Sequence, residues 1–397
     1  MATPGLTVPF SFDEQCRQGF TASMRTYVLN DLADHMRDVY EHRTKPTFER
    51  AQGQPPSSGP EVHKAMRRET IFKFYSALRC GVQEMCWRSV IPGVRRAAGD
   101  LNAAAASMSA EAADSGRATL DVDPSFTTPS YISDLDIHLM PGNYHEEHMP
   151  DDISQALIYD HGFDVFSMKL LGEKSDDIAR SISLFVATRF PELKPERIAD
   201  LGCLVGHSTL PWKERYPDAE VHGIDVARPC IRYAHARSQS YGQDVHFHLK
   251  DAVDTGFDDA SLDIVFSSML LHEMPPAEVS RLMGEIYRIL KPGGLMLHYE
   301  LPPNSLTDTY DSFYLDWDSY YNKEPFYKPV RDMDMSATMA QAGFDVADQV
   351  TFVVPSETMH GAQAVIDSVA QQDQPLDERI SRLVEGMSWF CFGARKK

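Results

Sequence analysis

The sequence predicts an α/β protein, in which a doubly wound, mostly parallel sheet of seven strands follows an N-terminal helical region. From about residue 150 onward, short apolar runs alternate with amphipathic helical stretches. Before residue 100, apolar and aromatic residues recur instead at three- and four-residue spacing. Strand–helix alternation of this length is typical of a parallel sheet with helices on both faces. The seven expected strands are 197–201, 220–226, 245–249, 262–267, 295–301, 344–354 and 388–396.

The N-terminal region, residues 1–130, is predicted to be mainly helical and to end in a linker, before an α/β domain over 131–397. Its apolar spacing indicates helices at 12–42 and 63–96, with a loop rich in Pro, Gly and Ser between them. We interpret 98–130 as the linker, although its alanines could form a short helix. The region could mediate a homodimer, cover a site as a lid or dock a partner, and the sequence leaves these three roles open.

The charge of the chain argues against nucleic acid as a partner. The chain carries 38 Lys and Arg against 58 Asp and Glu, a formal net charge of −20. Residues 101–397 contribute −23, whereas residues 1–100 contribute +3. Binding to a phosphate backbone requires clustered Lys and Arg, so we expect no nucleic-acid partner. The acidic balance favours a neutral or cationic small molecule over a phosphorylated one.

Membrane and secreted proteins are not favoured either. No apolar run approaches the ~20 residues that span a bilayer. The first residues lack the basic and apolar segments of a secretory signal. The six cysteines are scattered and include no CxxC pair, which argues against a disulfide framework or a zinc ribbon. We therefore expect a cytoplasmic protein with reduced thiols and no membrane association.

The most informative segment is IADLGCLVGHST, residues 198–209, which leads from a strand through a turn into a helix. Gly202 and Gly206 let the backbone of that turn approach a ligand without an intervening Cβ. The N-terminus of the following helix offers free N–H groups to an anionic part of the ligand. A dinucleotide-binding turn would need GxGxxG, but Leu204 occupies the place of the middle glycine. An NAD site is therefore disfavoured.

Two acidic positions at later strand ends add to this turn. Asp225 closes the second expected strand, where a carboxylate can accept hydrogen bonds from both hydroxyls of a ribose. Asp251 and Ala252 follow the third strand, where a carboxylate can accept from an exocyclic adenine amine. A KPGG turn at 291–294 then precedes the fifth strand. Together these features distinguish the segment from an ordinary packing turn.

These elements resemble the class I S-adenosylmethionine-dependent methyltransferases, of the small-molecule type, over about residues 195–301. The resemblance implies S-adenosylmethionine as cofactor, a glycine loop around its methionine part, and an antiparallel last strand in the sheet. One departure is Leu204, where the family commonly has the second glycine of a GxG turn. The cofactor-binding residues that the resemblance implies are Asp200, Gly202, Cys203, Gly206, Asp225, Val226, Asp251, Ala252 and Ser268.

His272, in the segment SSMLLHEMPP after the fourth expected strand, is the candidate catalytic base. Methyl transfer is an in-line displacement that needs a positioned nucleophile, exclusion of water and, for some acceptors, removal of a proton. An imidazole suits that last task because its pKa lies near neutral pH. Glu273 could orient this histidine or face solvent. We expect O-methylation of a small molecule; N-, C- or S-methylation by proximity alone and a non-catalytic binding protein are the alternatives.

The segment 299–327 is rich in aromatic residues and follows the fifth expected strand, where the family places contacts to the acceptor. Such a stripe is usually core packing, so we expect most rings to pack and one or two to line the site. Upstream, residues 136–168 hold several histidines whose spacing fits no metal-ligand set, and we predict no metal site. That segment also supplies candidates for a lid, Tyr144 among them. The predicted acceptor-binding residues are Tyr159, His161, Tyr299, Tyr314, Trp317 and Tyr321.

Overall fold

The computed structural model describes residues 3–372, 380–384 and 386–397. Its centre is an eight-stranded mixed sheet with the strand order β1-β4-β3-β2-β5-β6-β8-β7. The seven expected strands are present, and a two-residue strand beside β4 adds an eighth at the edge. The strands are β1 (Leu120–Asp121), β2 (Arg197–Leu201), β3 (Glu220–Asp225), β4 (His246–Leu249), β5 (Leu262–Ser268), β6 (Leu290–Glu300), β7 (Gln349–Pro355) and β8 (Ser388–Arg395).

The sheet is doubly wound about β2. This strand pairs in parallel with β3 on one side and with β5 on the other, so the order of the chain reverses there. In open α/β sheets, ligands bind beyond the carboxyl ends of the strands at such a reversal. The last strand, β8, runs antiparallel to both β6 and β7, as the sequence predicted.

Helices cover both faces of the sheet and bury two apolar clusters. On one face, α8 (Asp177–Arg189), α9 (Thr209–Arg215), α10 (Arg228–Ser240) and α16 (Ala362–Ser368) contribute to a cluster that includes Trp212 and Phe266. On the other face lie α11 (Pro276–Ile289) and α14 (Met335–Ala342). The remaining helices of the α/β part are α6 (Ser130–Ser133), α7 (Ser154–Phe166), α12 (Thr309–Tyr321), α13 (Tyr327–Arg331) and α15 (Glu357–His360). Turns of 3-10 helix lie at Ile137–Leu139, Leu271–Glu273, Asn304–Leu306 and Val346–Asp348.

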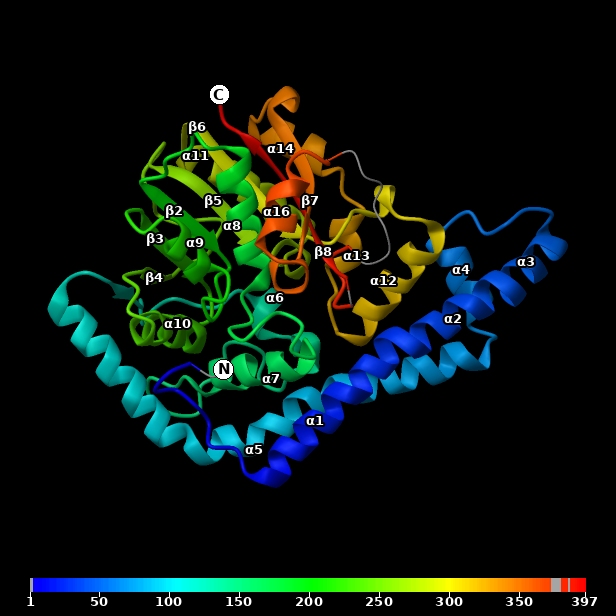
Figure 1. Cartoon of the computed structure of the whole chain (residues 1–397), viewed down its shortest axis with the longest axis horizontal. Helices are drawn as coiled ribbons and strands as arrows, with labels where there is room; N and C mark the ends of the chain where they lie inside the picture. The colour runs from blue at the N-terminus through cyan, green and yellow to red at the C-terminus, as the bar shows by residue number, and fades with distance from the viewer. Residues whose placement is uncertain (1–2, 373–379, 385) are drawn as a thin grey trace.

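The N-terminal helices form an elongated arm, residues 12–115, which we term the helical arm. Figure 1 shows α1 and α5 running side by side along one side of the α/β part, while α3 projects away from the sheet. A capping box at Ser11 starts the arm. The Ser11 hydroxyl accepts from the N–H of Glu14, and the Glu14 carboxylate accepts from the N–H of Ser11. The helices are α1 (Phe12–Tyr27), α2 (Ala33–Val39), α3 (Lys45–Gln52), α4 (Gly59–Met66) and α5 (Thr70–Ser115), with π-helical stretches at Val28–Leu32 and Tyr40–Thr44.

Two details of the arm correct the sequence prediction. The first helical stretch continues to Gln52, so the loop is shorter than expected. The predicted linker is helical as far as Ser115, because α5 runs without a break through its alanine-rich part. Alanine has the highest helix propensity, and Leu101 and Ala105 are buried in a cluster shared with α7 and α10. The division of the chain at residue 130 stays a prediction. Within the described residues, no helix combines the length and apolar character needed to cross a membrane.

Candidate functional site

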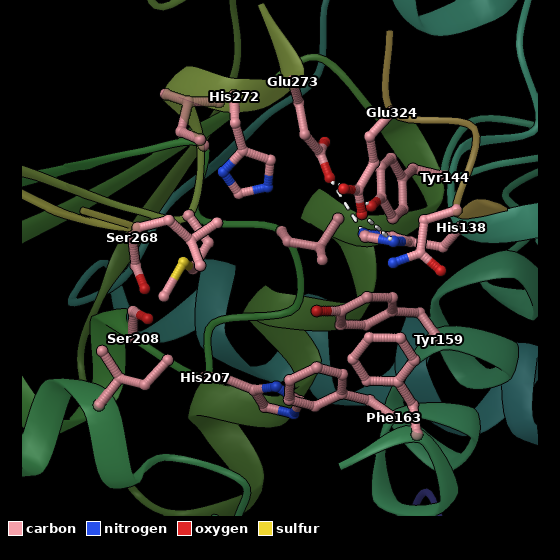
Figure 2. Close-up of a pocket in the computed structure, with 18 of the residues that line it drawn as sticks. His138, Tyr144, Tyr159, Phe163, His207, Ser208, Ser268, His272, Glu273 and Glu324 are labelled. Carbon is pink, nitrogen blue, oxygen red and sulfur yellow. Dashed lines mark hydrogen bonds and ion pairs between the residues drawn. The ribbon is translucent and has the colours of Figure 1, made fainter. Parts of the chain in front are cut away.

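A cavity of about 290 Å³ lies at the carboxyl ends of β2, β3 and β5 and extends to the helical arm. Its volume is close to the lower bound of about 300 Å³ for small-molecule sites. Its strand end is formed by the turns after β2 to β5 and lined by Gly202, Cys203, Leu204, Asp225, Val226, Asp251, Ala252 and Ser268. Its helical end is lined from α1, α5, α12 and the segment after it, among others by Arg25, Arg79, Tyr314, Asp318 and Glu324. In Figure 2, Ser208 and Ser268 lie on one side of the cavity, and Glu324 and His138 lie on the other.

The turn after β2 approaches the cavity through backbone conformations that suit glycine. Gly202 has φ +75°, and a Cβ built there would lie 2.6 Å from Cδ1 of Leu270. The N–H groups of Gly202 and Cys203 both donate to the carbonyl oxygen of Ile224, at 2.8 and 2.9 Å, which ties the turn to β3. Leu204 also takes positive φ, +48°, a left-handed conformation that costs a non-glycine residue about 1–2 kcal/mol. The turn therefore keeps the conformation of a glycine-rich loop without a glycine at 204.

Asp225 anchors this turn at the tip of β3. Its Oδ2 accepts from the N–H of Leu204 at 2.9 Å and its Oδ1 from the N–H of Ala227 at 2.9 Å. Each carboxylate oxygen can accept a second hydrogen bond, so ligand hydroxyls can still bind. Burial raises the pKa of Asp225 to about 6, against the opposing effect of the two backbone donors.

The other residues predicted at the strand end divide into lining and supporting positions. Cys203, Val226, Asp251, Ala252 and Ser268 line the cavity. Asp200 and Gly206 do not line it. Asp200 is fully buried at the end of β2, where its Oδ2 accepts from the Thr209 hydroxyl at 2.6 Å, and burial raises its pKa to about 7. Gly206 adopts φ +81° and accommodates the entry into α9.

His272 reaches the cavity from the 3-10 turn Leu271–Glu273, where β5 has ended. Its Nδ1 lies 2.7 Å from Oε2 of Glu300, a buried carboxylate at the end of β6. Glu300 Oε1 accepts from the N–H of Leu271 at 2.7 Å, which holds the carboxylate in place. Burial by itself lowers the pKa of this imidazole, but the charge and hydrogen bond of Glu300 outweigh burial and raise it to about 9. The sequence did not identify Glu300.

Glu273 does not orient His272 and does not face solvent, which corrects both sequence expectations. Its Oε1 accepts from the Tyr144 hydroxyl at 2.8 Å and lies 3.3 Å from Nε2 of His138. Nδ1 of His138 lies 2.8 Å from Oε1 of Glu324 (Figure 2). Burial lowers the pKa of His138, but the two carboxylates raise it to about 9. The structure thus places one imidazolium between two glutamates in the cavity wall.

The helix α7 supplies an aromatic wall, and its periodicity explains one wrong prediction. Tyr159 and Phe163 line the cavity and stack with ring centroids 5.2 Å apart, and Phe163 stacks on His207 at 5.6 Å. His161 lies on another side of the helix and packs edge-to-face against Phe10 at 5.3 Å. It does not line the cavity, because residues two apart on a helix point in different directions.

The aromatic stripe of α12 mainly joins this helix to the arm. Tyr314 lines the cavity, and its hydroxyl lies 3.0 Å from that of Tyr75 on α5. Trp317 instead packs on His63 with ring centroids 4.2 Å apart and donates through Nε1 to the Ser76 hydroxyl at 2.9 Å. Tyr321 packs edge-to-face on Trp317 and does not line the cavity. Trp317 and Tyr321, which we predicted to bind the acceptor, therefore lie outside the cavity wall.

Tyr299 is a further correction. It is fully buried and stacks on Phe266 beneath the sheet, with ring centroids 5.7 Å apart. Successive side chains of a strand point to opposite faces, so Tyr299 and Glu300 cannot both face the same side. Glu300 points toward His272, and Tyr299 joins the core.

The histidine-rich segment does not gather into a ligand set. In the parts of the chain that the structure describes, no group of three or more His, Cys, Asp or Glu side chains is placed to hold a metal ion. His138 enters the cavity wall, His161 packs on Phe10, and His148 is 4.0 Å from Glu146 near the surface.

Sequence reasoning missed the charged residues of the helical end. Glu300 could have been found, because it stands at a strand tip like Asp225. Arg25 and Arg79 carry no such signal, since each sits in an ordinary amphipathic helix far from the α/β part in sequence. Glu324 follows α12 in a turn that the aromatic stripe obscured.

The strand end has the chemistry that an adenosine-containing sulfonium cofactor needs. Asp225 presents a carboxylate with free acceptor capacity for ribose hydroxyls, and Asp251 lines the neighbouring turn as an acceptor for an amine. The backbone of Gly202 and Cys203 lies open to the cavity for the remainder of the ligand. The residues predicted from the family resemblance thus come together in one place, apart from the two supporting positions.

Comparison with known proteins agrees with this geometry. Residues 198–294 match the family model described as "Methyltransferase domain". Demethylmenaquinone methyltransferase of Thermus thermophilus is 37% identical over 112 residues, which are 28% of this chain and 50% of that protein. Malonyl-[acyl-carrier protein] O-methyltransferase 1 of Coxiella burnetii is 28% identical over 138 residues, 35% of this chain and 44% of that protein. The chain thus spans about half the length of these curated relatives.

Among solved structures, the comparison matches phosphoethanolamine N-methyltransferase 2 of Haemonchus contortus. Its TM-score is 0.38 at 20% identity, over 60% of this chain and 57% of that chain. The residues of the family match, 198–294, run from β2 into the turn that opens β6 and so include the glycine turn, Asp225, Asp251 and His272. Over this segment, the chain is similar to S-adenosylmethionine-dependent methyltransferases, in agreement with the resemblance seen in its sequence.

Proposed function

We propose that the protein transfers a methyl group from S-adenosylmethionine to an oxygen atom of a small molecule, with His272 as general base. The observation that carries this proposal is the continuity of one cavity from Asp225 to His272 and on to the helical arm. A cofactor held at the strand end and an acceptor at the helical end would meet beside this imidazole. The relatives named above include an enzyme named for O-methylation, which supports the choice of oxygen.

Different residues of the chain bind the ligand, exclude water and accept the proton in this reaction. S-adenosylmethionine, when bound, supplies a methyl group on a positively charged sulfonium. Asp225 and the turn at Gly202 hold the ligand at the strand end, and the aromatic wall from α7 and the helical arm exclude water. Glu300 holds His272 through Nδ1, which directs Nε2 to take the proton from the acceptor hydroxyl.

The protonation state of His272 sets the conditions for this role. With a pKa of about 9, the imidazole is protonated at neutral pH. Positive charge in the cavity lowers the pKa of a neighbouring imidazole, so loading of the strand end moves His272 toward its base form. If His272 instead stays protonated, it cannot act as a base. That state favours the second candidate, transfer by proximity alone to a nitrogen, carbon or sulfur acceptor.

The walls of the cavity support a small-molecule acceptor. Residues of both the α/β part and the arm enclose it, as in sites for small ligands. Arg25, Leu29 and Arg79 of the arm line it, which supports the lid among the three roles considered for the N-terminal region. Dimerisation through these helices stays a prediction, to be checked by the mass of the protein in solution.

The test combines binding with transfer. Calorimetric titration with S-adenosylmethionine and S-adenosylhomocysteine should show binding by the wild type, and Asp225→Ala should weaken it at least tenfold. The matched control is Asp258→Ala, at an exposed position away from the cavity. Transfer of a radiolabelled methyl group is then screened against phenols, carboxylates and amines, with products identified by mass spectrometry. Absence of binding by the wild type, or equal binding by Asp225→Ala, would refute the cofactor assignment.

A further inference from the structure

Arg25 is a buried cation at the helical end of the cavity. It projects from α1, is 1% exposed and lines the cavity. Its Nε donates to the carbonyl oxygen of Phe166 at 2.8 Å, and its Nη1 donates to Oε1 of Gln83 at 2.6 Å. The guanidinium also lies over the Phe166 ring, 4.2 Å from the centroid. Among the residues that the structure describes, no carboxylate pairs with Arg25 and no acceptor pairs with its Nη2.

Arg79 lies next to Arg25 but is neutralised. Its Nη2 donates to Oδ2 of Asp318 at 2.9 Å, and its Nε makes a second, short contact with Oδ1 of the same carboxylate. Its Nη1 donates at 2.9 Å to Gln83 Oε1, the oxygen that also accepts from Arg25. The two buried guanidinium groups therefore share the amide oxygen of Gln83, and the carboxylate of Asp318 pairs with Arg79.

The charge of Arg25 persists despite its burial. Burial, together with the charge of Arg79, lowers the pKa of Arg25 to about 10, which still leaves it protonated at neutral pH. A buried charge without a counterion is costly, and an incoming anion removes that cost by completing the pair. Arg382 lines the same end, with its guanidinium 4.3 Å from the centroid of the Tyr314 ring.

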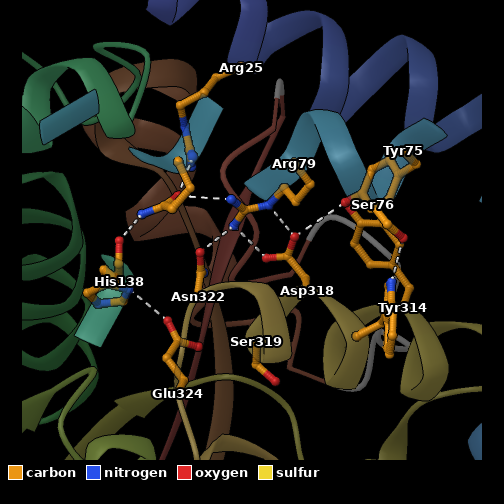
Figure 3. A network of polar contacts seen from close by, with 12 residues as sticks. Arg25, Tyr75, Ser76, Arg79, His138, Tyr314, Asp318, Ser319, Asn322 and Glu324 are labelled. Atoms are coloured by element: carbon orange, nitrogen blue, oxygen red, sulfur yellow. Dashed lines mark hydrogen bonds and ion pairs between the residues drawn. The ribbon is translucent and has the colours of Figure 1, made fainter. Parts of the chain in front are cut away.

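The neighbouring carboxylates are already used. Glu273 and Glu324 flank His138, and Asp318 belongs to Arg79. His138 and Glu324 appear both beside His272 in Figure 2 and beside Arg25 and Arg79 in Figure 3. These two residues therefore connect the two parts of the cavity wall. The unpaired cation therefore opens onto the same cavity as the candidate base.

We propose that the methyl acceptor carries a carboxylate, that Arg25 binds it, and that the acceptor extends from Arg25 toward His272. This inference rests on the proposed function and names the class of its acceptor. A guanidinium binds a planar carboxylate through directed N–H donors. The guanidinium of Arg25, which no carboxylate contacts among the described residues, matches a carboxylate better than a phosphate; a phosphate carries about −1.5 to −2 near neutral pH and would meet Glu273 and Glu324 in the same cavity. The net charge of −20, from which the sequence favoured a neutral or cationic acceptor, does not describe this end of the cavity.

The first test measures binding without turnover. The full chain, loaded with S-adenosylhomocysteine in low-salt buffer, is titrated with benzoate and with benzamide and followed by ligand-observed NMR. We expect benzoate to bind at least tenfold tighter than benzamide, and Arg25→Gln to bring the two within twofold. Arg25→Lys, which keeps the charge but not the fork, should retain part of the preference. Equal affinities in the wild type, a comparison that needs no variant, would overturn the proposal.

Two controls separate this inference from the proposed function. Arg88→Gln alters an exposed arginine of the same arm, 3.3 Å from Glu84, and should leave the benzoate preference unchanged. Binding of S-adenosylhomocysteine is measured for every variant, together with the melting temperature. If wild type binds S-adenosylhomocysteine but shows no benzoate preference, the acceptor class is wrong and the methyltransferase assignment stands. If S-adenosylhomocysteine does not bind, the proposed function fails whatever benzoate does.

The second test uses turnover. Hydroxylated aryl carboxylates are compared with their carboxamides as acceptors of a radiolabelled methyl group. We expect kcat/KM to be at least tenfold higher for the carboxylates in wild type, mainly through KM, and the difference to fall below threefold in Arg25→Gln. A carboxylate preference that survives in folded, cofactor-binding Arg25→Gln would overturn the role of Arg25. Equal or better use of the carboxamides by wild type would overturn the acceptor class.

Discussion

The two ends of the cavity are built in different ways. The strand end consists of turns that directly follow neighbouring strands, so Gly202, Asp225 and Asp251 meet because the parallel sheet brings strand tips to one edge. At the helical end, Arg25 and Gln83 come from α1 and α5 of the arm, whereas Asp318 comes from α12, more than 200 residues later in the chain. Packing of α1 on α5, and of the arm on α12, brings the three side chains together. The strand end therefore forms from the sheet alone, whereas the helical end forms only when the helical arm packs on the α/β part.

This difference assigns separate tasks to the two ends. Residues at the strand end should control binding of the cofactor, and residues at the helical end should control which acceptor is used. His272 and Glu300 lie where the two ends join, so changes there should affect the chemical step more than either binding event. The predictions below follow this division.

The largest effect is expected for His272→Ala. General bases contribute roughly 10²- to 10⁴-fold to rate, so kcat should fall at least a hundredfold while the Kd for S-adenosylhomocysteine changes less than threefold. Stopped-time radiolabel assays and calorimetry measure the two quantities. His148→Ala, at a half-exposed histidine near the surface, is the control and should be neutral. A rate that stays unchanged in His272→Ala would favour transfer by proximity.

Glu300→Gln should have a smaller effect and a diagnostic pH dependence. The base form of His272 is the neutral one, so kcat/KM should rise as pH increases toward the pKa of about 9. Removing the carboxylate lowers that pKa, and the rise should move to lower pH even as the maximum rate falls about tenfold. Glu273→Gln serves as the comparison, because Glu273 pairs with His138 rather than with His272. An identical pH profile in Glu300→Gln and wild type would contradict the pairing.

At the strand end, cofactor affinity should depend on the titration of Asp225. The carboxylate must be ionised to accept from two ribose hydroxyls, and its pKa is raised to about 6. Binding of S-adenosylhomocysteine should therefore be strongest above pH 6 and weaken several-fold as the pH falls from 7 to 5. Asp225→Asn should bind more weakly and lose most of this dependence. Calorimetric titrations at four or five pH values measure the slope, and a flat wild-type profile would disprove the link.

The smallest effect on activity is expected for Trp317→Phe. This ring joins α12 to the arm and does not line the cavity, so kcat and KM should change less than twofold. Stability should fall by about 1 kcal/mol, because the hydrogen bond from Nε1 to Ser76 is lost. Urea unfolding measures this loss. Tyr314→Phe, one turn earlier on the wall of the cavity, is the contrasting variant and should alter the KM of the acceptor.

Most errors of the sequence prediction concern which side of an element a residue occupies. Tyr159 and His161, like Tyr299 and Glu300, are near neighbours in sequence that point to different surroundings. Periodicity shows that such pairs diverge, but it does not say which member faces a cavity unless the packing partners are known. The linker prediction failed for the same reason, since only burial against α7 and α10 shows that the alanines of α5 belong to a packed helix.

By itself, the sequence determined the positions of the strands, the glycine turn and the acidic residues at the strand tips. From these features followed the resemblance to the methyltransferases and the residues at the strand end of the cavity. These features are local, because a turn and the strand before it lie within a few residues of each other. Only the tertiary structure decided that Glu300 rather than Glu273 holds His272, and that Arg25 lies at the helical end with no carboxylate partner among the residues that the structure describes. Both depend on side chains that approach across separate elements, and on the low-dielectric interior that makes a buried, unpartnered charge consequential.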